Sequence, residues 1–387
     1  MLIAVPRERN PRERRVSLVP DTVARLIKMN HRVLVEEGAG VLSGYSDQQY
    51  RDAGGEVVKS DPEWMKTVDL AITVQNTDFS SSSPYAFLRE GAYVIGMLGP
   101  LSSPAEMFEV LLKKKLTLFS MDVMPRISRA QSMDVLSSMS TIAGYRAAIM
   151  GADRLPKLFP LLMTAAGTIT PARVLILGAG VAGLQAIATT HRLGALVQAF
   201  DTRPIVREQV ESLGASFLTL EIQSQQTADG YAQALAEDIH QQELNLLAKP
   251  VSEADVVITT ALIPGKPAPL LITKEMVASM RSGSVIIDLA AETGGNCELS
   301  QPGEHVVTDN GVSIDAPLNI ASQMAPHASQ LYSRNVFNFL NHLFSMGLGE
   351  EGKELDTHDE IVARTMIIHD GEVLHEILTQ RMEQVRS

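Results

Sequence analysis

The fold is most readily inferred from Arg173-Val-Leu-Ile-Leu-Gly-Ala-Gly-Val-Ala-Gly-Leu-Gln-Ala-Ile-Ala188, in which an apolar strand enters a glycine-rich turn and then a helix. Gly178 allows the tight turn, Gly180 lets the backbone approach a pyrophosphate, and Gly183 allows close packing of the helix on the strand. The helix N-terminus adds free N–H groups and a positive dipole end for phosphates. The residues expected to contact a dinucleotide here are Gly178, Gly180, Val181, Ala182 and Gly183.

The segment that follows delivers a carboxylate where the ribose of such a ligand is expected. We expect the helix to run to Leu193 and the next strand to span Leu196–Phe200, which brings Asp201 to the strand end, 23 residues after Gly178. An acidic residue there accepts both adenosine-ribose hydroxyls and repels a 2′-phosphate. Arg203 could accommodate that phosphate, but with Asp201 present the segment Asp201-Thr202-Arg203 favours NAD(H) over NADP(H). The alternative is a glycine turn without a ligand.

Short Val/Ile/Leu runs separated by longer amphipathic segments predict an α/β fold with parallel, doubly wound, Rossmann-like sheets. The expected strands are Leu2–Val5, Arg32–Glu36, Leu70–Val74, Ala92–Met97, Leu116–Ser120, Val174–Leu177, Leu196–Phe200, Val256–Thr260 and Val285–Leu289. Helices are expected over Leu136–Met150 and over roughly 326–346, the second returning to the first domain. We therefore expect a discontinuous domain of residues 1–140 plus 316–387, a nucleotide domain of residues 141–315, and a cofactor cleft between them.

Composition excludes several classes of protein. The chain has 387 residues and a net charge of −12, which gives no electrostatic reason to bind nucleic acid. Cys297 is the only cysteine, so neither an intrachain disulfide nor a cysteine-based zinc cluster can form, and we expect no metal site. The N-terminus does not resemble a signal peptide and no run of 18 apolar residues occurs, so we expect a cytoplasmic protein.

Acid–base groups are scarce in the first half of the chain. A dehydrogenase that reduces a 2-oxo acid needs a histidine or lysine beside the nicotinamide to supply a proton. Of the nine histidines only His31 precedes residue 191, and the strand ends at Val74–Thr77 and Ile95–Pro100 carry no titratable side chain.

The chain resembles the family that contains alanine dehydrogenase and the NAD(H)-binding component of proton-translocating nicotinamide nucleotide transhydrogenase. The shared landmarks are Pro6–Glu8, Arg15–Pro20, Gly178–Gly183 and Asp288–Gly295. Where alanine dehydrogenases carry a catalytic lysine, histidine and aspartate, this chain has Gln75, the Gly96/Met97 neighbourhood and Glu292. Only the substrate-side arginine has a counterpart, Arg15.

Longer segments are similar to transhydrogenase, namely Met124–Asp134, Ala261–Pro269, Ala325–Ser329 and Asp359–Val362. The resemblance implies a loop at the nicotinamide, in which an arginine–aspartate pair orients the loop and a glutamine contacts the nicotinamide ribose close to NADP(H) on the partner. Catalytic roles then fall to Arg126, Gln131 and Asp134, and further cofactor contacts to Ser128 and Arg129.

Two other segments belong to the expected cofactor site. Ala261 and Leu262 follow a strand and are expected to pack on the adenine or ribose side of the cofactor. Taken alone, the polar segment around Gly230 and Tyr231 is typical of a solvated surface loop. The resemblance implies instead a mobile loop that closes over the nucleotide.

The expected function is therefore hydride transfer between NADH and NADP+ held on a partner subunit. Transfer between the C4 atoms of two nicotinamides moves no proton at the reacting centre, so the missing acid–base groups fit it. The resemblance implies a homodimer that docks an NADP(H)-binding domain and a separate membrane-spanning component, on the cytoplasmic face of the inner membrane. The alternatives are an alanine dehydrogenase-like enzyme, a non-catalytic NAD(H) sensor and, least favoured, a membrane-binding structural protein.

Overall fold

The computed structural model describes residues 1–75, 83–103, 106–219, 232–263, 265–350 and 352–386. The chain divides into two compact units, Met1–Met139 with Ala321–Ser387 (unit 1) and Ser140–Ile320 (unit 2). Helix α4, Val135–Arg154, contains the first boundary between them. Among the described residues, no helix has both the length and the apolar character needed to cross a membrane.

Unit 1 is built on an eight-stranded sheet of order β17-β16-β6-β5-β4-β1-β2-β3. Its strands are β1 Leu2–Val5, β2 Arg32–Glu36, β3 Glu56–Val58, β4 Leu70–Ile72, β5 Tyr93–Gly96, β6 Thr117–Ser120, β16 Met366–His369 and β17 Glu372–Val373. Its helices are α1 Pro20–Lys28, α2 Asp47–Asp52, α3 Glu106–Lys113, α9 Ala325–Ser345, α10 Glu360–Thr365 and α11 Glu376–Arg386. Helices α3 and α11 bury apolar side chains on one face of the sheet. On α9, Phe339 packs edge-on against Phe119 of β6, with ring centroids 5.8 Å apart.

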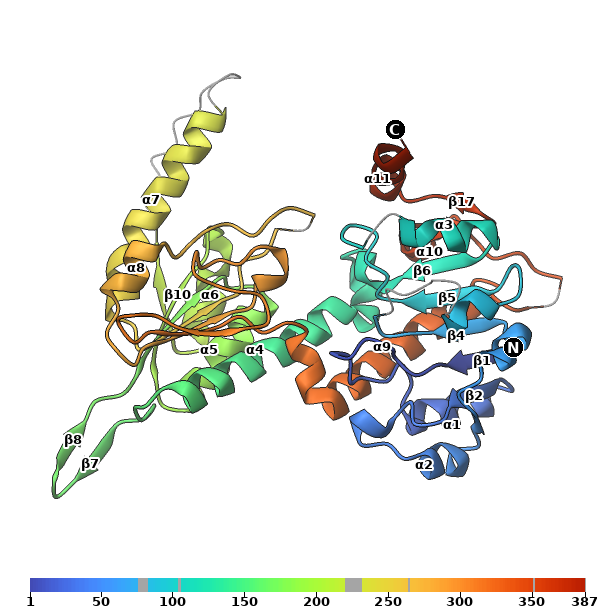
Figure 1. Cartoon of the computed structure of the whole chain (residues 1–387), viewed down its shortest axis with the longest axis horizontal. Coiled ribbons are helices and arrows are strands. Elements are labelled where there is room, and N and C mark those ends of the chain that lie inside the picture. The colour runs from blue at the N-terminus through green and yellow to red at the C-terminus, as the bar shows by residue number, and fades with distance from the viewer. Residues whose placement is uncertain (76–82, 104–105, 220–231, 264, 351, 387) are drawn as a thin grey trace. The chain divides into compact units, whose positions relative to one another are not determined.

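Unit 2 is built on a seven-stranded sheet of order β11-β10-β9-β12-β13-β15-β14. Its strands are β9 Arg173–Leu177, β10 Leu196–Phe200, β11 Ser216–Leu218, β12 Val256–Thr259, β13 Val285–Asp288, β14 His305–Val307 and β15 Ser313–Asp315. Its further helices are α5 Val181–Arg192, α6 Arg207–Ser212, α7 Ala232–Glu253 and α8 Lys274–Ser279. One face is covered by α4, α5 and α6, and the other by α7 and α8 (Figure 1).

Both sheets have the same doubly wound topology. From the first strand of each sheet the chain adds two strands on one side and then continues on the other, so the order reverses between β1 and β4 and again between β9 and β12. These pairs are parallel, and a ligand is expected outside the carboxyl ends of the strands at such a reversal point. The α/β class with two Rossmann-like domains is thus confirmed, and each of the nine expected segments overlaps a strand.

The structure adds antiparallel elements that the sequence patterns did not predict. Strands β14, β16 and β17 pair antiparallel at the sheet margins. A separate hairpin joins β7, Leu162–Thr164, to β8, Gly167–Ile169, and every residue of both strands is exposed. A strand buried on neither face lacks the apolar/polar alternation from which strands are recognised, which is why this hairpin was missed.

Candidate functional site

The glycine-rich turn lies at the reversal point of unit 2, between the end of β9 and the start of α5. Gly178 has a φ of +98°, in the region that favours glycine. A Cβ there would lie 2.6 Å from Thr260 Oγ1 and 3.1 Å from the Ala261 amide nitrogen. The turn is therefore pressed against the segment that follows β12, and glycine is required at position 178 by the fold itself.

Gly180 differs because its backbone is extended, at φ −75° and ψ −170°. Among the described residues, no heavy atom beyond its chain neighbours lies within 4 Å of where its Cβ would be. Gly180 is the N-cap of α5 and no side chain caps the helix there. The first turn of a helix has N–H groups without intrahelical partners, and its dipole favours an anion. The space above Gly180 suits a pyrophosphate, since the fold does not itself require glycine at this position.

The backbone from Val181 to Gly183 is fixed by close contacts within unit 2. A Cβ at Gly183 would collide with the carbonyl oxygen of Gly178, and one at Gly144 of α4 would collide with the carbonyl oxygen of Ala182. Thr260 Oγ1 also donates a hydrogen bond of 3.0 Å to the Gly178 carbonyl. The sequence reasoning missed Gly144, although a glycine within an uninterrupted helical pattern is a sign of close packing.

Asp201 lies directly after β10 and is half-buried. Its carboxylate accepts hydrogen bonds from the Ala179 amide at 2.8 Å and from Arg203, whose Nε and Nη2 each lie 2.9 Å away. Burial by itself raises the pKa of Asp201, but the hydrogen bonds from Arg203 and Ala179 outweigh it and the pKa lies below its ordinary value. The structure thus places an ionised carboxylate beside the glycine turn, with an exposed guanidinium next to it. Thr202 is exposed between them.

The turn after β12 is held by one side chain. Asn296 accepts from the Ala261 amide at 3.1 Å and donates to the carbonyl oxygens of Ala261, at 2.9 Å, and of Pro269, at 2.8 Å. Leu262 is left 55% exposed although it follows a buried strand. An exposed leucine on a backbone fixed in this way suits the apolar face of an adenine. Asn296 gave no sequence signal, because an isolated asparagine in a loop is ordinary.

The remaining expected contacts lie in unit 1, on or next to a 3-10 turn at Ser128–Met133. Arg126, Ser128 and Gln131 are exposed there. Arg129 forms an ion pair with Asp359, Nη1 to Oδ2 at 2.8 Å. Asp134 accepts from the amide of Ser137 at 2.9 Å and from its hydroxyl at 2.5 Å.

Two expected cofactor contacts, Gly230 and Tyr231, lie outside the described residues. The described parts of the expected site are the glycine turn, Asp201 and the Ala261 turn in unit 2, and the loop in unit 1. The segment expected to close over the nucleotide is not among them.

The reversal point of unit 1 is filled by its own side chains. Glu8 accepts from the Thr73 hydroxyl at 2.8 Å and from the amides of Val74, at 2.7 Å, and Gln75, at 3.4 Å. Burial, and secondly the charge of Glu13, raise the pKa of Glu8 to about 7. Arg15 is held by Glu13, with Nε and Nη2 at 2.7 and 2.6 Å. Gln75 also accepts from Arg15 at 3.3 Å.

Two carboxylates of the shared motifs are engaged within unit 2. Asp288 is fully buried and accepts hydrogen bonds from the amides of Ala290, Asn296 and Cys297 and from the hydroxyls of Thr259 and Ser300. Glu292 accepts from the amide of Asn319 at 2.6 Å. Asp288 therefore fixes the loop between β13 and Ser300. No cluster of three or more His, Cys, Asp or Glu side chains suited to a metal occurs among the described residues.

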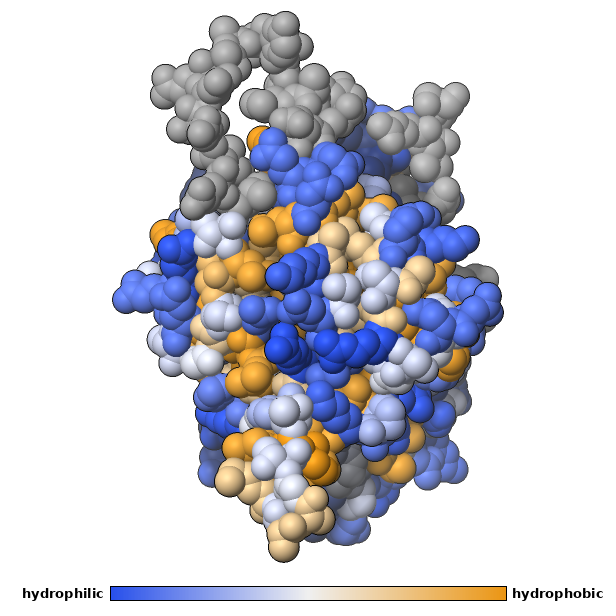
Figure 2. Space-filling view, turned by 90° about the vertical axis from the view of Figure 1, so that its left-hand side faces the viewer, coloured by the Kyte–Doolittle hydropathy of each residue, from blue (hydrophilic) through white to orange (hydrophobic). Residues whose placement is uncertain are grey.

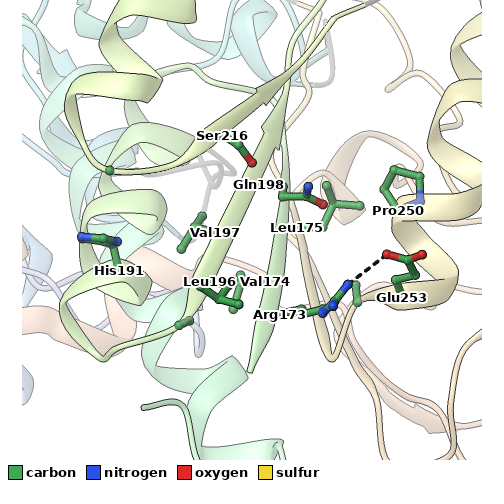
Figure 3. A pocket seen from close by; sticks show the side chains of 13 residues that line it. Arg173, Val174, Leu175, His191, Leu196, Val197, Gln198, Ser216, Pro250 and Glu253 are labelled. Carbon is green, nitrogen blue, oxygen red and sulfur yellow. Dashed lines mark hydrogen bonds and ion pairs between the residues drawn. The ribbon is translucent and has the colours of Figure 1, made fainter. Parts of the chain in front are cut away.

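A cavity of about 330 Å³ lies at the opposite edge of the unit 2 sheet (Figure 3). It is lined by the first residues of three strands, Arg173, Leu196 and Ser216, and by Glu253, which forms an ion pair with Arg173 at 3.0 Å. Ligands of doubly wound sheets bind at the carboxyl ends of the strands, whereas this cavity is at the amino ends. It is therefore separate from the glycine turn.

The comparisons with known proteins agree with this geometry. The family models "Alanine dehydrogenase/PNT" match residues 4–143 with the N-terminal domain and 147–376 with the C-terminal domain. An NAD(P) transhydrogenase subunit alpha chain of Rhodospirillum rubrum is 45% identical over 386 residues, covering 98% of this chain and 99% of that protein. The crystal structure of transhydrogenase from Sinorhizobium meliloti has a TM-score of 0.85 at 41% identity, covering 96% of this chain and all of that one. An L-alanine dehydrogenase structure has a TM-score of 0.81 at 25% identity, covering both chains fully. The chain belongs to the alanine dehydrogenase/PNT family.

Proposed function

We propose that this chain is the NAD(H)-binding subunit of a proton-translocating transhydrogenase and transfers hydride between NADH and NADP+ held on a partner subunit. The observation that carries the proposal is the glycine turn, where Gly180 leaves open space above an uncapped helix N-terminus and Asp201 stands beside it. The near full-length similarity to a transhydrogenase subunit alpha chain supports the choice of reaction.

In the proposed mechanism the nicotinamide supplies the hydride from its C4 atom, and the chain binds and orients it. The amides at the start of α5 bind the pyrophosphate, and Asp201 accepts hydrogen bonds from the adenosine ribose. Arg203 donates to both oxygens of Asp201, but the carboxylate beside the ribose would still repel a 2′-phosphate, which favours NAD(H). Ala261 and Leu262 pack against the adenosine. Gln131 contacts the nicotinamide ribose, while Arg126 and Asp134 orient its loop.

The proposed reaction does not require this chain to donate or accept a proton. Hydride transfer between two nicotinamides needs positioning and a site poor in water. At the sheet reversal point of unit 1 the side chains are already hydrogen bonded within the protein. Glu8 accepts a hydrogen bond from the Val74 amide, just after β4, and Arg15 donates to Glu13. Gln75, where an alanine dehydrogenase has its lysine, has no basic nitrogen to offer. These features favour transhydrogenase over an amino-acid dehydrogenase.

We also propose a homodimer, with NADP(H) on a second type of subunit and a separate membrane-spanning component on whose cytoplasmic face this chain sits. The homodimer is supported by the hairpin β7–β8, which carries exposed Leu162, Met163 and Ile169, at 40, 72 and 45% exposure. Apolar side chains gather at the lower end of Figure 2, where this hairpin lies. An isolated two-stranded hairpin is marginally stable in water, so a second copy of the chain is the proposed cover.

The oligomer proposal has a direct test. Met163→Asp with Ile169→Asp should convert the dimer to a monomer in analytical ultracentrifugation, since two charges would be buried without partners. Val307→Asp, at another apolar residue that is 61% exposed, is the matched control and should leave the mass unchanged. A wild-type monomer at micromolar concentration would contradict the homodimer.

The central experiment mixes the purified chain with NADH, the NADP(H)-binding component of a transhydrogenase and an oxidised NADP analogue, and follows hydride transfer by absorbance. A parallel reaction contains NADH, pyruvate and ammonia without the second component. Rapid transfer only with the second component supports the proposal. Turnover with pyruvate and ammonia identifies an amino-acid dehydrogenase, and NADH binding without either reaction identifies a sensor.

Gln131 provides a sharper test within the same assay. Gln131→Asn should leave the NADH dissociation constant nearly unchanged and slow transfer by on the order of a hundredfold, because a shift of about 1 Å at the reacting centre has an effect of that size. Equal losses of binding and rate would make Gln131 an affinity residue only.

A further inference from the structure

One stripe of α9 is polar and faces the loop that contains Gln131. Asn335, Asn338 and His342 are spaced by three and four residues, so they lie on one side of the helix. The side-chain amides of Asn335 and Asn338 both donate to the carbonyl oxygen of Ser132, at 2.9 and 3.0 Å. Two donors on one carbonyl leave the loop little freedom to move along the helix.

The third residue of the stripe reaches the loop through a carboxylate. His342 Nε2 lies 2.8 Å from Asp359 Oδ1, and Arg129 Nη1 lies 2.8 Å from Asp359 Oδ2. Oδ1 of Asp359 also accepts from the amides of Ile361 and Val362, which caps α10. Asp359 is 8% exposed, whereas Arg129 is 54% exposed. Asp359 therefore joins α9, α10 and the loop at one point.

The helix that carries this stripe is itself firmly placed. Val336, Phe339, Leu340 and Leu343 on its other sides are fully buried in unit 1. At the far end of the loop, Asp134 is hydrogen bonded to Ser137 in the first turn of α4. Hydrogen bonds or an ion pair thus hold the loop at Arg129, Ser132 and Asp134. Gln131 lies between these positions and is exposed.

We propose that Asp359, His342, Asn335 and Asn338 are positioning residues, which hold the Ser128–Met133 turn so that Gln131 presents the nicotinamide for transfer. This inference rests on the proposed function. It assigns Arg129 the same task, so its guanidinium binds the protein and not the cofactor. Hydride transfer then depends on a cluster that does not touch the nucleotide.

The first test separates rate from affinity. Asp359→Asn keeps an N-cap residue of equal preference and removes the charge that pairs with Arg129. Transfer to an NADP analogue on the partner component should slow about 10- to 100-fold, with the NADH dissociation constant changed less than about twofold. Asn338→Ala should slow transfer in the same way, and Arg129→Lys should retain more activity than Arg129→Ala. Asn341→Ala, on the same helix but outside the stripe, should match the wild type.

Additivity gives a second criterion. If Arg129 and Asp359 act as one unit, the double variant Arg129→Ala/Asp359→Asn should be no slower than the slower single variant. Wild-type rates in Asp359→Asn and Asn338→Ala would overturn the inference, as would rate and NADH affinity falling together.

A readout that needs no activity separates this inference from the proposed function. Trypsin cleaves after Arg126 and Arg129, so limited proteolysis of the full chain reports opening of the loop. At a temperature well below the melting temperature of each variant, Asp359→Asn should be cut there at least several-fold faster than the wild type and Asn341→Ala. A wild type that transfers no hydride would contradict the proposed function alone. Unchanged cleavage in Asp359→Asn would overturn the positioning role.

Discussion

The two sheet reversal points of this molecule share a topology and are used in opposite ways. In unit 2 the described residues leave open space above Gly180, and no side chain caps the amides at the start of α5. In unit 1 the segment after β1 sends Glu8 across to the end of β4, where it accepts hydrogen bonds from the Thr73 hydroxyl and the Val74 amide. One site is left for a ligand, and the other is closed by the chain's own carboxylate.

The contrast shows that a doubly wound sheet offers a crevice but does not decide what fills it. Backbone amides at the strand ends need an acceptor wherever they are buried. In unit 1 Glu8 accepts hydrogen bonds from the amides that follow β4. In unit 2 Asp201 accepts the Ala179 amide, and no side chain caps the start of α5, so the amides there remain available to an external anion. The following predictions test this contrast, beginning with the largest expected effect.

Gly180→Val should strongly weaken nucleotide binding while leaving the fold intact. The extended backbone and the free space at this position accept a side chain, so the free energy of unfolding should fall only by about 1 kcal/mol, because valine is a poorer N-cap residue than glycine. The isopropyl group would occupy the pyrophosphate position, and NADH affinity should fall about a thousandfold, roughly 4 kcal/mol. Titration of protein fluorescence with NADH and urea unfolding measure the two quantities. Retained affinity would place the pyrophosphate elsewhere.

Glu8→Ala should have the reverse effect, with stability lost and nucleotide binding retained. The change leaves the hydroxyl of Thr73 and the amide of Val74 buried without their acceptor. Unsatisfied buried donors cost about 1–3 kcal/mol each, so we expect the free energy of unfolding in urea to fall by about 3 kcal/mol at pH 4.5, where the contribution of Glu8 is close to its full value. Weakened NADH binding in a fully folded Glu8→Ala protein would mean that the unit 1 crevice takes part in cofactor binding.

Glu8→Gln should change how stability depends on pH. The pKa of Glu8 is about 7 in the folded chain and ordinarily 4.5, so the folded state binds a proton that the unfolded state has released between these values. The contribution of Glu8 is therefore full below pH 4.5 and is lost as the pH rises to about 7. Between pH 4.5 and 7 the free energy of unfolding of the wild type should fall by roughly 2–3 kcal/mol relative to that of Glu8→Gln. If the free energies of the two proteins instead run parallel with pH, the raised pKa is contradicted.

Asp201→Ala should weaken NADH binding by about 2 kcal/mol, which is 10- to 100-fold, through loss of charge-assisted hydrogen bonds to the ribose. Asp201 also accepts from the Ala179 amide, so part of the loss would come from a looser turn. Asp201→Asn retains an acceptor and should lose less. An unchanged dissociation constant for both variants would remove Asp201 from the ribose site.

Much of the fold and half of the site could be read from local patterns. The runs Val174–Leu177 and Val285–Leu289 indicated buried parallel strands because both faces of the sheet are covered, and the glycine spacing located the turn. The roles of Thr260, Asn296 and Gly144 could not be read in this way. Each acts on a residue far along the chain, and nothing beside it in the sequence marks the contact.

The order of the amino acids was enough to establish the α/β class, the family and the position of the nucleotide turn, because these depend on periodicity and on glycines at fixed offsets. The folded chain was needed to tell which glycine the fold requires and which one serves a ligand, since Gly178 and Gly180 differ in what lies across from them. Folding also brought Asp359 to Arg129 and Glu8 to the end of β4. Such pairs escape sequence reasoning because hydrogen-bond partners are chosen by burial and proximity in space, which local sequence does not encode.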